Sequence, residues 1–268
     1  MILRPQFVRQ TAGTALRHRA RSKLRQGWME FILLALLVLL VLLVLLASNT
    51  AAEPAAEQVV LLHGIGKQAR DMAPLAKILE RAGYKVLNLD YPSTDAPIEP
   101  LAIGLLDQVQ QHLSPLKTTH FVAHSMGGLI ALHLAAVMTD FPIGRMVQLG
   151  TPNHGSEVAD ALQHQRWFKA LYGPAGQQLT TEARNQPLPS QRADAFGIIA
   201  GNRSIDPISS WLIPGPDDGK VAVARTRHGD MDDHIVLGVA HPFLPRSEQV
   251  HDQVLYFLKN KYFYKKYN

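Results

Sequence analysis

Ser125 lies between a predicted strand and a predicted helix. The run at 120–123 predicts a buried strand, and apolar residues at helical spacing predict a helix at 127–138. Ala123 and Gly127 flank it at positions −2 and +2. A sharp strand-to-helix turn needs small residues at these positions if the backbone is to push a serine hydroxyl outward. A serine that only capped the helix would not explain them. The chain has no cysteine, so Ser125 is the candidate nucleophile.

A second glycine-rich motif, His63-Gly64-Ile65-Gly66, directly follows the apolar run 59–62. Ligands of open parallel sheets bind beyond the carboxyl ends of the strands, so we expect this loop and Ser125 to face one crevice. The backbone N–H groups of Ile65 and Met126 would then form an oxyanion hole for acyl transfer. A plain turn and a phosphate loop are alternatives. The stretch has no G-x-G-x-x-G and no Walker lysine, which argues against nucleotide binding.

His241 is the candidate general base, because it ends the apolar run 235–240 and so lies beyond a predicted strand on the crevice side. His124, beside the nucleophile, is expected to pack or to gate the site. The alternatives for the base are His234, which lies at the opposite end of the same strand, His154, which we expect to shape a loop, and His251.

Three motifs together resemble the α/β-hydrolase superfamily, and within it the bacterial lipases and esterases. They are His63–Gly66, Ala123–Gly128 and Leu149-Gly150-Thr151-Pro152-Asn153-His154-Gly155-Ser156. The resemblance covers about residues 58–258. The sequence departs from the G-x-S-x-G pattern because Ala123 takes the place of the first glycine, as it does in small secreted bacterial lipases.

The resemblance implies the chain order serine, acid, histidine. Residues 216–223, Pro-Asp-Asp-Gly-Lys-Val-Ala-Val, are similar to the acid loop of the family, where the aspartate just before glycine orients the histidine. It therefore implies Asp218 as the acid, with Asp217 as the alternative. Asp-Gly is also an ordinary turn signal, so a solvated turn is the other interpretation.

The rest of the chain alternates strand and helix patterns. Strands are predicted at 59–62, 85–89, 120–123, 146–149, 195–200 and 235–240, and helices at 72–82, 98–113, 127–138 and 247–259. Such alternation predicts an α/β domain with a mainly parallel central sheet and helices on both faces. The resemblance implies that this is the α/β-hydrolase fold.

Residues 156–194 separate two predicted strands and contain a cluster of large apolar side chains at helical spacing. These are Trp167, Phe168, Leu171 and Tyr172. In the superfamily such an insertion commonly covers the crevice and contacts the acyl chain, and an ordinary core helix is the alternative. We therefore predict 156–194 as a lid and its four apolar side chains as substrate contacts.

An apolar segment at 28–47 contains 17 consecutive apolar residues, 31–47, and no polar face. At 1.5 Å per residue this is the short limit for crossing a hydrocarbon core of ~30 Å. Seven Lys/Arg precede it, in the basic segment 1–27, and only two follow soon after. The sequence predicts a transmembrane anchor with a cytoplasmic N-terminus and an exported, periplasmic or extracytoplasmic domain.

The segment 48–57 is small and polar and predicts a linker between the anchor and the domain 58–258. Small residues at 50–52 would also suit a cleavage site, which would make the domain secreted, but the apolar run is longer than a usual signal region. Residues 259–268 mix aromatic residues with lysines. That composition suits a membrane surface, although a solvated tail is the commoner outcome.

Charge and composition exclude several functions. The net charge is +5. Removing the +6 of residues 1–30 and the four lysines of 259–268 leaves −5 for the interior, which argues against nucleic-acid binding. The sequence predicts a serine hydrolase of the lipase or esterase type acting on an ester or lipid, with no metal or cofactor. An acyltransferase or thioesterase on the same triad, and a non-catalytic anchored module, are the alternatives.

Overall fold

The computed structural model describes residues 27–43, 56–186, 188–189 and 192–265. The chain divides into two compact units, 1–54 and 55–268, and each is described by itself.

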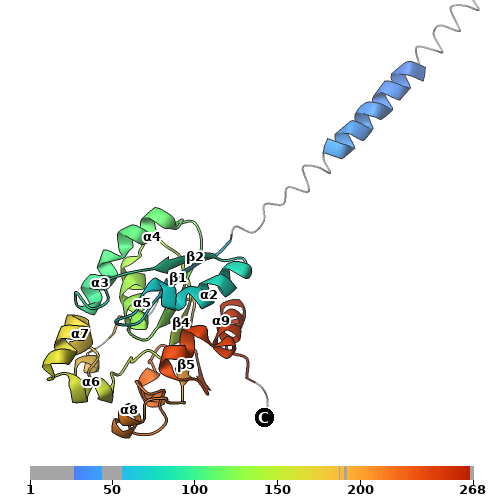
Figure 1. The fold of residues 1–268 in the computed structure, drawn as a ribbon. Coiled ribbons are helices and arrows are strands. Elements are labelled where there is room, and N and C mark those ends of the chain that lie inside the picture. The colour runs from blue at the N-terminus through green and yellow to red at the C-terminus, as the bar shows by residue number, and fades with distance from the viewer. Residues whose placement is uncertain (1–26, 44–55, 187, 190–191, 266–268) are drawn as a thin grey trace, which may run out of the picture. The chain divides into compact units, whose positions relative to one another are not determined.

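The second unit is built on a six-stranded sheet in which all paired strands are parallel (Figure 1). The spatial order is β2-β1-β3-β4-β5-β6. The strands are β1 Gln58–Leu62, β2 Lys85–Leu89, β3 Thr119–His124, β4 Ile143–Leu149, β5 Ala195–Gly201 and β6 Asp233–Leu237. The predicted strands are confirmed, and their carboxyl ends meet at one edge because the register pairs Leu62 with both Leu89 and Ala123.

Helices cover both faces of the sheet, as the alternation of apolar side chains along the buried strands requires. Val59 and Leu61 of β1 pack with α2 Ala69–Arg81 and α9 Glu248–Asn260 on one face. Val60 and Leu62 face the other side, where the helices are α3 Ile98–Gly104, α4 Leu106–His112 and α5 Met126–Val137.

Two predicted elements differ from what the periodicity indicated. The predicted helix 98–113 is split into α3 and α4 at Leu105, whose N–H donates to the carbonyl of Ala102, three residues back. The predicted strand 235–240 stops at Leu237, because the N–H of Val239 donates to the Leu237 carbonyl and turns the chain. His241 lies beyond the strand, as predicted, and begins a 3₁₀ turn, η3 His241–Arg246.

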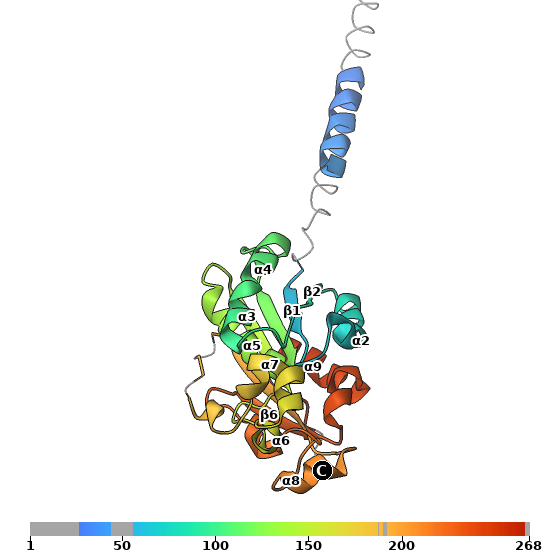
Figure 2. The same cartoon turned by 60° about the vertical axis from the view of Figure 1, so that its left-hand side comes forward.

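The predicted lid region contains α6 Glu157–Leu162, α7 Arg166–Gln177 and the 3₁₀ turn η1 Ala183–Asn185. Between β5 and β6 lie α8 Pro207–Leu212 and a second 3₁₀ turn, η2 Val223–Thr226. Figure 2 shows α6 and α8 as neighbours, as Figure 1 does, and the two helices are in contact.

The end of the chain is mostly exposed as far as residue 265, and one buried aromatic side chain anchors it to the domain. Phe263 is buried against Phe257, with ring centroids 4.7 Å apart. Asp233 accepts the N–H of Phe263 at 2.8 Å and pairs with Lys265 at 2.7 Å. Residues 266–268 lie outside the described part.

In the first unit, residues 27–43 form a helix whose large apolar side chains are each half or more exposed. Among the residues that the structure describes, no helix has both the length and the apolar character that crossing a membrane requires. Of the predicted N-terminal segment, anchor and linker, residues 1–26, 44–47 and 48–55 lie outside the described part of the chain, as do residues 187, 190 and 191 of the predicted lid.

Candidate active site

Ser125 occupies a strained turn between β3 and α5. Its φ of 55° and ψ of −131° lie in a region that non-glycine residues rarely adopt. The Ser125 N–H donates to the carbonyl of Leu149 at the end of β4, at 2.8 Å, which fixes the turn to the neighbouring strand. The strain places the hydroxyl at the carboxyl edge of the sheet.

The glycines around this turn are required by close approach of backbone to backbone. A Cβ on Gly127 would lie 2.5 Å from the carbonyl oxygen of His63 and 2.7 Å from that of Leu62. A Cβ on Gly64 would lie 3.0 Å from the Cβ of Ser125. The loop after β1 and the start of α5 can therefore meet beside Ser125 only because both residues lack side chains.

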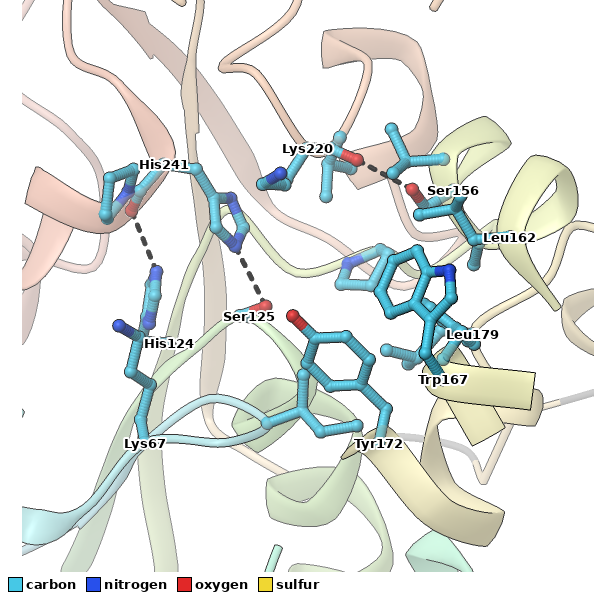
Figure 3. Close-up of a pocket in the computed structure, with 17 residues that line it drawn as sticks. Lys67, His124, Ser125, Ser156, Leu162, Trp167, Tyr172, Leu179, Lys220 and His241 are labelled. Atoms are coloured by element: carbon cyan, nitrogen blue, oxygen red, sulfur yellow. Dashed lines mark hydrogen bonds between the residues drawn. The ribbon is translucent and has the colours of Figure 1, made fainter. Parts of the chain in front are cut away.

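His241 bridges Ser125 and Asp218 (Figure 3 shows the serine side). Its Nε2 lies 2.9 Å from the Ser125 Oγ, and its Nδ1 lies 2.7 Å from the Asp218 Oδ2. Asp218 is buried, and its Oδ1 accepts the N–H groups of Lys220 and Val221. The His241 N–H donates to the Asp218 carbonyl at 2.9 Å, which ties the two loops together. The structure thus brings Ser125, His241 and Asp218 into one hydrogen-bonded chain.

The alternative acid lies in a different environment. Asp217 accepts the Ser210 hydroxyl at 2.6 Å and the Gly219 N–H at 2.7 Å, so it shapes the turn and does not bond His241.

The alternative bases also have other partners. His234 pairs with the Thr226 hydroxyl at 3.0 Å, and His251 pairs with the Pro245 carbonyl at 2.9 Å. The backbone N–H of His154 donates to the Arg225 carbonyl, and no bond between His154 and Ser125 occurs among the described residues.

Gly150, after β4, is a site residue whose role sequence reasoning missed, although it belongs to the third motif. Its φ is +61°, and a Cβ there would lie 3.0 Å from the Asp218 Oδ2 and 3.2 Å from the His241 Nδ1. Only glycine lets the chain turn this close to the Asp–His pair. A glycine directly after a buried strand was the available signal.

The two expected oxyanion donors lie on either side of the turn at Ser125, one in the loop after β1 and one at the start of α5. Within the described part of the chain, no acceptor pairs with the backbone N–H of Ile65 or of Met126. The neighbouring Gly66 N–H is held by the Ser93 Oγ at 2.9 Å. The loop is further fixed by His63, which stacks on Tyr91 at 4.0 Å and accepts the Tyr91 hydroxyl at its carbonyl oxygen.

His124, the residue before Ser125, contacts the candidate base His241. Its Nε2 lies 3.0 Å from the main-chain carbonyl oxygen of His241, so this nitrogen carries the proton and donates (Figure 3). The two rings are 4.8 Å apart. Burial holds the pKa of His124 well below its usual value, and the proximity of His241 lowers it further. A neutral His124 positions the loop of His241, a role beyond the packing or gating that the sequence indicated.

A pocket of about 340 Å³ opens beside Ser125. In Figure 3, Trp167 and Tyr172 lie on the opposite side of Ser125 from His124. The apolar wall comes mainly from Ile65, Val158, Ala159, Leu162, Trp167, Phe168, Tyr172 and Leu179. A cavity of this size and lining is typical of a small-molecule site.

One of the four predicted substrate contacts lies outside this pocket. Leu171 does not line it and is 57% exposed. Phe168 and Tyr172 are four residues apart and face the pocket together, whereas Trp167 and Leu171 lie on the adjoining stripe of α7. The longer indole of Trp167 reaches the pocket from there, and the leucine does not.

The parallel sheet with a Ser–His–Asp chain beyond its carboxyl edge defines the class of the α/β hydrolases. A family model described as the alpha/beta hydrolase family matches residues 59–253, and the chain belongs to that family. No curated protein sequence shows significant similarity to the chain.

Solved structures share the fold at low identity. A lipase from Bacillus licheniformis in its mature form has a TM-score of 0.61 at 19% identity, over 78% of this chain and 94% of the lipase. A metagenomic carboxyl esterase has a TM-score of 0.54 at 16% identity, over 70% of this chain and 65% of the esterase. A tomato methylketone synthase complexed with 2-tridecanone has a TM-score of 0.53 at 13% identity, over 77% of this chain and 99% of the synthase.

Proposed function

We propose that this protein is a serine hydrolase that cleaves carboxylic esters through an acyl-enzyme. The observation that carries the proposal is the continuous hydrogen-bonded chain from the Ser125 Oγ through His241 to the buried carboxylate of Asp218. The fold shared with lipases and a carboxyl esterase supports the same reaction class.

In the proposed mechanism the Ser125 Oγ attacks the ester carbonyl carbon while His241 Nε2 accepts its proton. The carbonyl π electrons move to oxygen and form a tetrahedral oxyanion. His241 then gives the proton to the leaving alcohol as the C–O bond breaks. Water, deprotonated by the same nitrogen, attacks the acyl-serine, and release of the acid returns the proton to Ser125.

Asp218 acts through His241. Its Oδ2 accepts the Nδ1–H, which leaves Nε2 as the basic nitrogen and stabilises the imidazolium that forms in each half-reaction. The carboxylate stays in place because two backbone N–H groups, those of Lys220 and Val221, hold its other oxygen.

The backbone N–H groups of Ile65 and Met126 are proposed to stabilise the oxyanion. Both are unpaired in the described structure, and fixed donors aimed at a developing charge are worth about 3–4 kcal/mol each in such reactions. The stacked His63–Tyr91 pair holds the loop that carries Ile65.

The acyl group is proposed to lie in the apolar pocket under α6 and α7. Trp167, Phe168 and Tyr172 form a wall that suits a hydrocarbon chain and has few donors for a polar acyl group. We therefore assign esters with a medium-length acyl chain, or lipid esters, as the substrate class, with α6 and α7 as the lid.

We also propose that residues 28–47 tether the chain to a membrane with the domain exported. The proposal is supported by the exposed apolar side chains of the helix 27–43 and by the basic residues that precede it. Alkaline phosphatase joined after residue 57 should be active. An inactive fusion, with a cytoplasm-dependent reporter active at the same position, would contradict export.

The hydrolase proposal is tested by turnover of p-nitrophenyl butyrate and octanoate. Ser125→Ala should reduce kcat by at least about a thousandfold, because the nucleophile is lost. Ser114→Ala, before β3 at the opposite edge of the sheet, is the matched control and should turn over normally. Release of the free acid supports hydrolysis, whereas release of mainly the glyceryl ester when glycerol is added would favour an acyltransferase.

A further inference from the structure

The segment between β5 and the loop of Asp218 exposes three large apolar side chains to solvent. Ile205 is 60% exposed, Ile208 77% and Trp211 85%. We call these three residues the α8 patch, because α8 Pro207–Leu212 carries two of them. Large apolar side chains gathered at one exposed site of a domain usually mark an interaction surface.

The backbone that presents the α8 patch is fixed by hydrogen bonds. Asp206 caps the helix and accepts the Ser209 N–H at 3.0 Å and the Ser209 hydroxyl at 2.7 Å. Lys220 pairs with the same carboxylate at 2.8 Å, which holds the pKa of Asp206 far below its usual value. The exposure is thus a property of an ordered turn that holds the side chains outward.

The segment that carries the α8 patch packs beside residues that line the pocket, because α8 contacts α6. Lys220, which bonds the N-terminus of α8, lines the pocket, and its carbonyl accepts the Ser156 hydroxyl at 2.7 Å. Ile213, just after α8, packs against Val158 and Leu162, two further pocket-lining residues. The buried side of this segment therefore supports residues of the pocket wall, and its exposed side carries the α8 patch.

The exposed area is too small for a stable protein interface. Aromatic side chains bury 150–250 Å², so one indole and two isoleucines expose roughly 400 Å² together. A stable protein–protein interface needs about 800 Å² from each partner. Insertion of a few apolar side chains into a lipid surface needs no such area and no matching shape.

Charge and residue type also fit a lipid surface. The two aspartates that flank the α8 patch in the chain are both bonded, Asp206 to Lys220 and Asp217 to Ser210 and Gly219. Arg203 is exposed nearby. Tryptophan suits the boundary between headgroups and hydrocarbon, because its ring is apolar and its N–H is polar.

We propose that the α8 patch docks the domain on a lipid surface and turns the mouth of the pocket toward that surface. This goes beyond the proposed ester chemistry and does not depend on it. An apolar ester would then pass from the lipid to the pocket past Val158 and Leu162 without crossing water.

The test follows the fluorescence of Trp211 in the full chain, with Trp28→Phe and Trp167→Phe removing the other two indoles. The protein is reconstituted in phosphatidylcholine vesicles with and without brominated acyl chains. We expect a blue-shifted spectrum and at least about a twofold loss of intensity with the brominated lipid. Ile205→Ser with Ile208→Ser should restore most of that intensity.

A matched control separates docking from mere closeness to the membrane. Leu116→Trp, in a chain whose three native tryptophans are phenylalanine, places an indole at a position that is 92% exposed near the opposite edge of the sheet. It should be quenched by aqueous iodide and not by brominated lipid. The Ser125→Ala chain should give the same Trp211 signal as the active chain, so a failure of the proposed catalysis leaves this test intact.

Two results would overturn the proposal. Equal iodide quenching of Trp211 with and without vesicles, with no bromine effect, would show that the α8 patch stays in water. A blue shift that grows with protein concentration in detergent, without lipid, would show that a second copy of the chain covers it.

Discussion

The Nε2–H of His124 donates to the main-chain carbonyl of His241 at 3.0 Å. The bond links the residue before Ser125 to the histidine that hydrogen-bonds the Ser125 hydroxyl. The two residues are 117 positions apart in the chain. The bond fixes η3 against β3 at the point where the His241 ring must stay within 2.9 Å of the Ser125 Oγ.

We therefore expect His124→Phe to lower kcat about tenfold, because the His241 loop loses its anchor and a buried carbonyl loses its donor. His124→Gln should restore part of the rate, since its amide can donate in place of Nε2–H. The measurement is kcat and KM on one soluble ester. A fall in stability with an unchanged kcat would limit His124 to packing.

The second prediction separates the two adjacent aspartates. Asp218→Asn should lower kcat by up to about 10⁴, because an amide cannot hold the His241 tautomer with Nε2 as the base. Asp217→Asn is the matched control and should keep kcat within a few-fold, since within the described part of the chain the Asp217 carboxylate bonds Ser210 and Gly219 and not His241. The reverse order of the two rates would exchange their roles.

Much of this site could be predicted from the sequence, because the ends of the strands determine where its residues lie. Buried runs end just before His63 and Ser125, and a parallel sheet brings such ends to one edge. The choice between Asp218 and Asp217 depends on which side of a turn each carboxylate faces. The residue types do not show this, and only the resemblance to the family favoured Asp218. His124 and Gly150 act through backbone contacts of distant segments, which periodicity does not reveal.

The features that the sequence did not indicate share a physical cause. The sequence pattern does not show where a backbone hydrogen bond ends an apolar run, as at Leu237, or which stripe of a helix reaches a pocket, as with Leu171. It also does not show that Phe263 would find a buried place beside Phe257.

The third prediction concerns acyl chain length. Each methylene buried on an apolar wall contributes ~0.8 kcal/mol, so four added carbons should raise kcat/KM by up to ~200-fold. Trp167→Ala with Phe168→Ala should flatten this preference, because both side chains line the pocket. Leu171→Ala is the control on the same helix and should leave the profile unchanged. An unchanged profile in the double variant would make α7 an ordinary packing helix.

The fourth prediction is a pH dependence of stability that centres on His234. Burial lowers the pKa of His234 from 6.5 to about 4, and Arg227 adds to the effect. The unfolded chain therefore binds more protons between these values, so stability falls as the pH drops from 6.5 toward 4. His234→Gln should make the Tm less dependent on pH over this range. An equally steep dependence in the variant would assign the effect to other groups.

The most direct test of the proposed mechanism is labelling with a fluorophosphonate, which reacts with an activated serine hydroxyl. The wild-type chain should gain one adduct, which peptide mass spectrometry locates on Ser125, and the Ser125→Ala chain should gain none. His241→Ala should label at least about a hundredfold more slowly, because the serine loses its base. An adduct on another serine, or equal labelling of the wild-type and His241→Ala chains, would contradict the assignment of Ser125 and His241 as nucleophile and base.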